Sequence, residues 1–103
     1  PVAAANGIGV LARVPLAGGV LSGKYKPGHK FPPNDYREKW AREDVKQREL
    51  AAVPDLLKNE VPPGMPLPEW AIAWCLKNPA VSCVIPGAKS VAQVLSNARA
   101  ADI

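Results

Sequence analysis

Two short apolar runs rich in β-branched residues constrain the fold more than any other feature of the chain. Residues 8–14 run up to Pro15, and residues 81–85 run up to Pro86 and Gly87. Runs of this length and composition are typical of fully buried parallel strands. Helical patterns lie between and after them, and two strands joined by a helical crossover are the unit of parallel α/β folds. Two strands alone cannot close a sheet, so we expect an α/β chain that is incomplete on its own.

The longest segment between the two strands is predicted to form a charged helix. Asn34 or Asp35 is expected to cap a helix that runs to about Lys58, and Pro54 is expected to break or kink it. From Arg37 onwards, basic and acidic side chains alternate and pair at helical spacing. This pattern indicates a helix face that is covered by solvent.

Two further helices are predicted towards the carboxyl end. Residues 67–77 begin with Pro68 and Glu69, which suit the first turn of a helix. The rest of this segment is apolar nearly all round, so we expect it to be deeply packed. The loop and the helices before the second strand together occupy residues 35–77, and a final helix is expected over residues 90–102.

Composition excludes several classes of function. The net charge is only +4 and the basic residues are mixed with acids, which does not suit a nucleic-acid groove. No apolar stretch approaches the ~20 residues of a membrane span. No cluster indicates a metal, and Cys75 and Cys83 are expected to be buried thiols in the reducing cytoplasm. The chain starts at Pro1 rather than Met, and both of its ends are expected to be cuts.

The connector after the first strand is the first candidate site. It runs from Pro15 to Lys24 and is rich in glycine, whose backbone can approach a phosphate closely while the lysine adds charge. Residues from Gly18 onwards also match most of the P-loop pattern, but Tyr25 stands where a P-loop needs Ser or Thr for magnesium. From these residues alone, a glycine-rich turn without a ligand is as well supported as a phosphate site.

The second candidate is the end of the second strand, where residues 85–90 lead into the last helix. Unpaired N–H groups and the helix macrodipole favour an anion there, and Lys89 is placed to pair with a phosphate. Alternatively, Ser90 and Gln93 form a capping box, which the spacing alone favours for Gln93. The two loops carry more weight together, because the loops after strands seven and eight of a (β/α)8 barrel commonly form a phosphate site.

Three segments resemble the aldo-keto reductases. Residues 13–25 (RVPLAGGVLSGKY) resemble that family's seventh-strand segment, which is typically SPLAxGLLTGKY. Residues 81–90 (VSCVIPGAKS), together with Gln93 and Asn97, resemble its eighth-strand segment, VxxxIPGARxxEQxxEN. Residues 70–76 (WAIAWCL) match the LALRWCL-like helix between these strands. The motifs occur in the family's order and spacing, and they leave out only the proline-rich middle of the chain.

The resemblance implies a fold and a cofactor. The fold is the carboxy-terminal part of a TIM barrel, from seventh strand to final helix, in an enzyme that uses NADPH to reduce an aldehyde or ketone to an alcohol. The remaining partners would be a small carbonyl substrate and the missing amino-terminal half of the barrel. The residues implied at the cofactor pyrophosphate are Pro15, Leu16, Gly18, Leu21, Ser22 and Lys24. Those implied at the adenosine phosphate and adenine are Gly87, Lys89, Ser90, Gln93 and Asn97.

Three positions depart from the family pattern. Val14 replaces the usual Ser, Lys89 replaces an Arg and so lacks its planar fork, and Ser96 replaces the Glu expected at the adenine amine. NADPH remains the expected cofactor.

The residues that the family uses for catalysis have no counterpart here. Its catalytic Tyr, Lys, Asp and His lie in the first half of the barrel and match no segment of this chain, so we expect no catalytic residue and no activity from the chain alone. Two alternatives are a non-catalytic NADPH-binding regulatory barrel and a phosphate-loop nucleotide-binding fragment.

Overall fold

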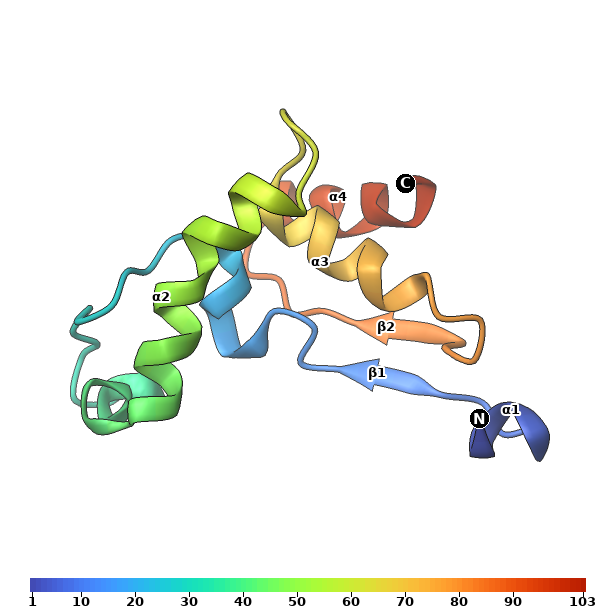
Figure 1. The fold of residues 1–103 in the computed structure, drawn as a ribbon, viewed down its shortest axis with the longest axis horizontal. Coiled ribbons are helices and arrows are strands. Elements are labelled where there is room, and N and C mark those ends of the chain that lie inside the picture. The colour runs from blue at the N-terminus through green and yellow to red at the C-terminus, as the bar shows by residue number, and fades with distance from the viewer.

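The computed structural model describes all 103 residues, which form a two-stranded sheet with helices α2, α3 and α4 to one side of it (Figure 1). Two of the three 3₁₀ helices, η1 and η2, lie between the strands and the third, η3, ends the chain. The elements in chain order are α1 (Val2–Ala5), β1 (Leu11–Arg13), η1 (Ala17–Ser22), η2 (Tyr36–Arg42), α2 (Asp44–Asn59), α3 (Leu67–Leu76), β2 (Cys83–Ile85), α4 (Val91–Arg99) and η3 (Ala100–Asp102).

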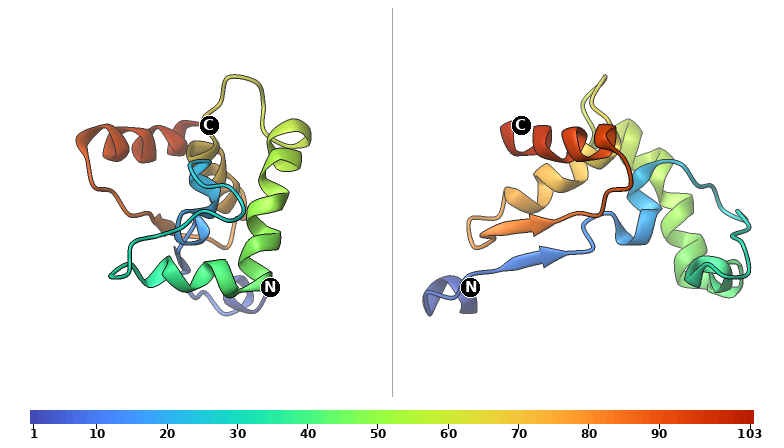
Figure 2. Two further views of the ribbon diagram at one scale, coloured as in Figure 1. Left: turned by 90° about the vertical axis from the view of Figure 1, so that its left-hand side faces the viewer. Right: turned by 180° about the vertical axis from the view of Figure 1, so that it is seen from behind.

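The two strands pair in parallel, as an α/β fold with a helical crossover requires. Leu11 pairs with Cys83 and Arg13 pairs with Ile85. Both strands run in the same direction, so the segments that follow them leave from the same edge of the sheet (Figures 1 and 2). This edge is where the two candidate loops meet.

The strands are shorter and more exposed than the sequence predicts. The paired ladder covers three residues of each strand, and Leu11 and Ile85 are 63% and 52% exposed. The expectation of fully buried strands is therefore wrong for this chain. The chain has no third strand, and its helices cover only part of the sheet. Apolar residues of both strands are therefore exposed to solvent.

The main core lies beside the sheet, between η1, η2 and α2. Leu50, which is 1% exposed, sits in the centre of this cluster. The cluster takes its members from η1, η2, α2 and α3 and from the connections between them, so it fixes η1 against α2. Its buried residues are Val20, Phe31, Trp40, Leu50, Val53, Val61 and Leu67.

The predicted helix over residues 35–58 is two elements. Asp35 caps η2 by accepting a hydrogen bond from the Arg37 N–H, and the helix stops at Glu43, whose backbone is extended. A new helix, α2, then runs through Pro54 to its end. Pro54 was expected to break or kink the helix, and a break does not occur, because core contacts around Leu50 hold the helix together despite the missing N–H.

Helix α3 is packed on one side only. Ala71 and Ile72 are buried, whereas Trp74 is 63% exposed, so the expectation of deep packing all round is wrong. The buried Glu69 faces α4, where its Oε1 accepts hydrogen bonds of 2.9 Å from Ser96 and Arg99. This contact fixes α4 against α3.

The expected burial of both cysteines is wrong for Cys83, which is exposed in β2, while Cys75 is half-buried. Both thiols are free. No helix has the length and apolarity to cross a membrane.

Truncation of Leu50 tests the central role of this core. Leu50→Ala should lower the free energy of unfolding by about 2–5 kcal/mol, because it leaves a cavity in a packed cluster. Leu57→Ala, on the same helix but 44% exposed, should cost less than about 1 kcal/mol. Denaturant unfolding of both variants measures the difference, and equal losses would contradict the packing described.

Candidate functional site

A groove of about 610 Å³ lies at the shared edge of the sheet, where the segments after β1 and β2 meet. Its volume is in the usual range for a small-molecule site. The groove is lined by Arg13, Val14, Pro15, Leu16, Gly18, Gly19, Ser22, Lys24, Tyr25, Tyr36, Arg37, Ile85, Pro86, Gly87, Ala88, Lys89 and Gln93.

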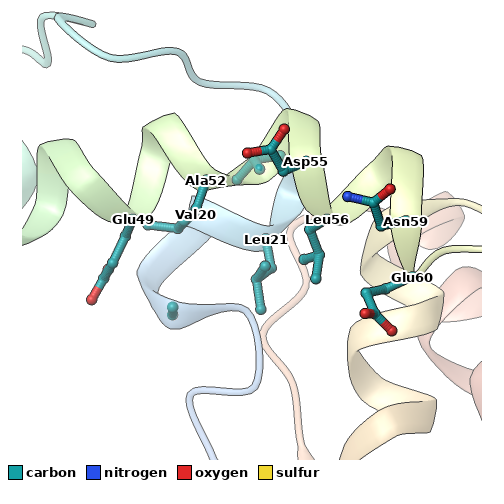
Figure 3. Close-up of a pocket in the computed structure, with 10 residues that line it drawn as sticks. Val20, Leu21, Glu49, Ala52, Asp55, Leu56, Asn59 and Glu60 are labelled. Carbon is teal, nitrogen blue, oxygen red and sulfur yellow. The ribbon is translucent and has the colours of Figure 1, made fainter.

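The structure brings most of the predicted site residues to this groove. Eight of the eleven line it: Pro15, Leu16, Gly18, Ser22, Lys24, Gly87, Lys89 and Gln93. Ser90, the N-cap of α4, and Asn97, within α4, are not among the lining residues. Leu21 lines a different, mainly apolar groove of about 450 Å³ between η1 and α2, together with Leu56 (Figure 3).

The lining of the main groove has one sign of charge. Four cationic residues from three separate segments line it, Arg13, Lys24, Arg37 and Lys89. No Asp or Glu is among the lining residues, and only Arg37 of the four is paired with an acid, Asp35. Such a surface raises the local concentration of anions. The groove is therefore suited to an anionic ligand that is long enough to touch both loops.

The glycines of the first loop have two roles. Gly18 and Gly19 have φ of +72° and +115°, values that residues with a side chain rarely adopt. A Cβ on Gly18 would lie 3.0 Å from the Tyr36 hydroxyl, and one on Gly19 would lie 3.0 Å from Arg37 Nη1. Because Gly18 and Gly19 have no side chain, the segment that carries Tyr36 and Arg37 can pack closely against this loop.

Several polar groups of the first loop bond within the loop itself. The N–H groups of Gly19 and Leu21 both donate to the Leu16 carbonyl, each at 3.0 Å. The Ser22 hydroxyl donates to the Gly19 carbonyl and accepts from the Lys24 N–H. These bonds shape the loop, so its Lys24 ammonium, which is not part of them, is the group most free to meet a ligand.

Strain accompanies the start of this loop. Val14, which follows β1 and lines the groove, has φ of +57°, a left-handed conformation that is costly for a β-branched residue. Its position between the strand and the loop turns the chain towards η1. Backbone strain of this kind persists where the surrounding structure imposes it.

The second loop is shaped by α4. The Ser90 hydroxyl accepts a hydrogen bond from the Gln93 N–H at 3.2 Å, the main-chain half of a capping box. Gln93 Oε1 accepts instead from the Lys89 N–H, one residue earlier than the capping box requires. Asn97 Nδ2 donates to the Gly87 carbonyl at 3.1 Å. Gln93 and Asn97 thus hold the backbone that presents Lys89.

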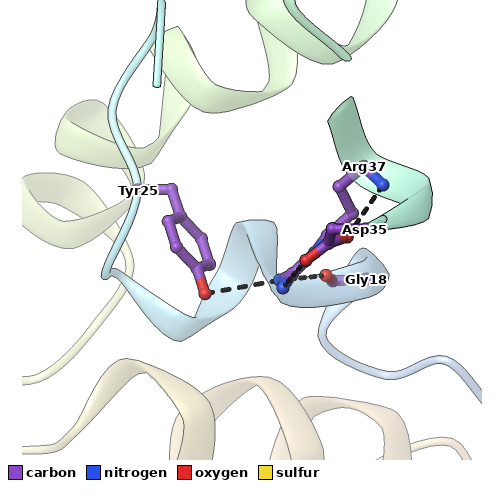
Figure 4. Close-up of polar contacts among 4 residues, drawn as sticks. All are labelled: Gly18, Tyr25, Asp35 and Arg37. Atoms are coloured by element: carbon purple, nitrogen blue, oxygen red, sulfur yellow. Dashed lines mark hydrogen bonds and ion pairs between the residues drawn. The ribbon is translucent and has the colours of Figure 1, made fainter. Parts of the chain in front are cut away.

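Tyr36 and Arg37 also line the groove, although their sequence pattern did not indicate a site. Arg37 was expected on a solvated helix face, but its side chain is only 16% exposed and lies against the first loop (Figure 4). The charge pattern gave the wrong prediction because η2 is a short 3₁₀ helix whose first residues pack against Gly18. The one available signal was Asp35, a capping residue two positions before an arginine.

Asp35 and Arg37 form an ion pair beside the groove, with Arg37 Nη2 2.8 Å from Asp35 Oδ2. Hydrogen bonds from the Arg37 side chain and backbone lower the pKa of Asp35 from its usual value to about 2. The same side-chain bond to Asp35 raises the pKa of Arg37. The pair therefore stays ionised at any physiological pH.

The pH dependence of stability tests this pair. Because the pKa of Asp35 is lower in the folded state, its contribution to stability is complete above about pH 4 and is lost as the pH falls through about 2. Asp35→Asn and Arg37→Gln should each remove that part of the acid dependence, measured as unfolding midpoints between pH 2 and 6. Curves parallel to that of the unaltered protein would contradict the pairing.

Comparison with known proteins matches the chain to a single family. The aldo/keto reductase family matches residues 1–103. A protein described as "Probable voltage-gated potassium channel subunit beta" from Arabidopsis thaliana is 39% identical over 111 aligned residues, which cover 100% of this chain and 33% of that protein. One with the same description from Oryza sativa subsp. japonica has the same identity and coverage.

The chain thus spans about a third of the length of these curated relatives. Its two parallel strands, with the helical crossover between them, are consistent with part of the barrel that the family forms. Since the family match extends over every residue, this chain belongs to the aldo/keto reductase family.

Proposed function

We propose that the groove binds the phosphates and adenosine of NADPH, as part of an oxidoreductase that reduces aldehydes or ketones to alcohols. One observation supports this most strongly. Loops that follow two adjacent parallel strands share a groove lined by no acid and by three cationic residues that form no ion pair, Arg13, Lys24 and Lys89. Family membership supports the oxidoreductase class.

The residues of the groove fit a dinucleotide in their chemistry. Lys24 and Lys89 come from opposite loops, so a ligand with two phosphate positions can neutralise both. Lys89 precedes the first turn of α4, where the helix N-terminus also favours negative charge. The role of these residues is to bind and orient, and the bound nicotinamide would supply the hydride.

The chemistry needs residues outside this chain. The catalytic Tyr, Lys, Asp and His that the family resemblance implies have no counterpart in residues 1–103. Carbonyl reduction is therefore proposed for the whole protein that carries these residues, and cofactor binding for this part of it.

Charge reversal at Lys89 tests the cofactor assignment. In the intact protein, Lys89→Glu should raise the Kd for NADPH at least about tenfold more than the Kd for NADH, because only NADPH carries the extra phosphate that Lys89 is assigned to meet. Fluorescence titration with both dinucleotides measures the two constants.

A matched control separates this local effect from the change in net charge. Lys58→Glu makes the same change at an exposed site in the last turn of α2, away from the groove lining, and should alter neither constant by more than about twofold. Equal losses for NADPH and NADH in Lys89→Glu would contradict the role assigned to Lys89.

A second candidate function is a non-catalytic barrel that binds NADPH and regulates a partner. The description of both plant relatives as potassium channel β subunits favours it, since a regulatory subunit can keep a cofactor groove without carbonyl reduction. Turnover decides between the two. A protein that binds NADPH but does not oxidise it with any aldehyde or ketone would support the regulatory function.

A P-loop nucleotide site is the weaker alternative. Tyr25 holds the position of the magnesium-binding hydroxyl, but its OH accepts a hydrogen bond from Arg37 and its ring lies against Phe31. We expect nucleotide binding to be insensitive to magnesium, as measured by the Kd in its presence and after chelation. A strong dependence on magnesium would favour the P-loop function instead.

A further inference from the structure

Arg37 occupies an unusual place for a cation that lines an anionic ligand's groove. Its guanidinium lies 4.4 Å from the centre of the Phe31 ring and 5.2 Å from that of Tyr25. Its side chain is only 16% exposed. Aromatic rings at these distances stabilise the charge of the guanidinium and shield it from water, so the side chain is held in one position.

The hydrogen-bond donors of Arg37 are almost all in use. Nε and Nη2 donate to the two carboxylate oxygens of Asp35, at 3.0 and 2.8 Å. Nη1 donates to the Gly18 carbonyl and to the Tyr25 hydroxyl, both at 3.3 Å. A guanidinium has five N–H donors, so one remains. Arg37 cannot bind a phosphate with two parallel hydrogen bonds unless it first releases Asp35, Gly18 or Tyr25.

The bond to Gly18 acts on one particular peptide unit. The peptide between Gly18 and Gly19 has its carbonyl held by Arg37, and its N–H donates to the Leu16 carbonyl at 3.0 Å. Both glycines have positive φ, and with no side chain on either residue this peptide has little else to fix its orientation. It also forms part of the groove wall, since both glycines line the groove.

We infer that Arg37 is a positioning residue, which fixes the Gly18–Gly19 peptide in the wall of the groove and does not itself bind the ligand's phosphates. Asp35 orients Arg37 through two hydrogen bonds, and the Phe31 and Tyr25 rings pack against its guanidinium. Its effect on affinity comes from a preorganised loop, which a ligand does not have to order on binding. For the identity of the ligand, this inference rests on the proposed function.

Asp35→Asn separates positioning from direct binding by the sign of its effect. Asn at this position still caps η2, so the variant removes mainly the anchor of Arg37. If Arg37 positions the loop, the variant binds NADPH and NADH more weakly by the same factor, about threefold to tenfold. If Arg37 binds phosphate and Asp35 merely competes for it, the loss of a negative charge tightens NADPH binding, which would overturn the inference.

Arg37→Lys provides the second variant, because it keeps the charge and loses the planar fork. We expect the Kd for NADPH and for NADH to rise together by about tenfold in the intact protein. Affinity equal to that of the unaltered protein, or a loss confined to NADPH, would overturn the inference. Arg42→Lys and Glu38→Gln are matched controls, since they alter an exposed ion pair in the same 3₁₀ helix and should leave both constants unchanged.

Hydrogen–deuterium exchange tests the positioning without any ligand. In Arg37→Lys and Asp35→Asn, exchange across residues 16–24 should be faster by about tenfold and should increase clearly more than exchange in α2, which reports the loss of overall stability. An equal increase in both segments would indicate only a general loss of stability and contradict a local role. If the unaltered protein binds no dinucleotide, the proposed function fails, and the exchange measurement still decides the role of Arg37.

Discussion

The parallel pairing of β1 with β2 is the interaction on which the candidate site depends. Three paired residues on each strand set the register, and with it the positions of the two loops that follow. Pro15 and Pro86 stop the strands at the same edge, so Lys24 and Lys89 face one groove although 64 residues separate them along the chain. Neither loop alone would offer more than a lysine beside a turn.

Helix packing supports this arrangement from behind. Leu50 and its neighbours fix η1 against α2, which anchors the first loop. Glu69, Ser96 and Arg99 fix α4 against α3, and α4 in turn holds the Gly87 carbonyl and the Lys89 N–H of the second loop. The same contact shows what Ser96 does in place of the Glu that the family resemblance implies at this position. Ser96 stands where the family has a Glu, but its hydroxyl is bonded to Glu69 and does not face the groove.

Much of this could be predicted from local pattern. The apolar runs that end at proline locate both strands, and the glycine-rich and lysine-bearing loops follow from their residue types. The degree of burial could not be predicted. Leu11 and Trp74 are large apolar residues of the kind that is usually buried, but nothing in this chain covers them. Asp35 was predicted as a possible helix cap, but the place of Tyr36 and Arg37 in the groove was not, since the alternating charges resemble a solvated helix. Only the tertiary contact with Gly18 shows that Arg37 belongs to the groove.

The central claim is that the two loops form one anion-binding groove. Its most direct test is an NMR titration of the intact, isotope-labelled protein with NADPH, following the backbone amides of residues 15–24 and 86–93. We predict that amides of both loops shift together and follow a single Kd. Shifts confined to one loop, or two separate affinities for the two loops, would contradict it.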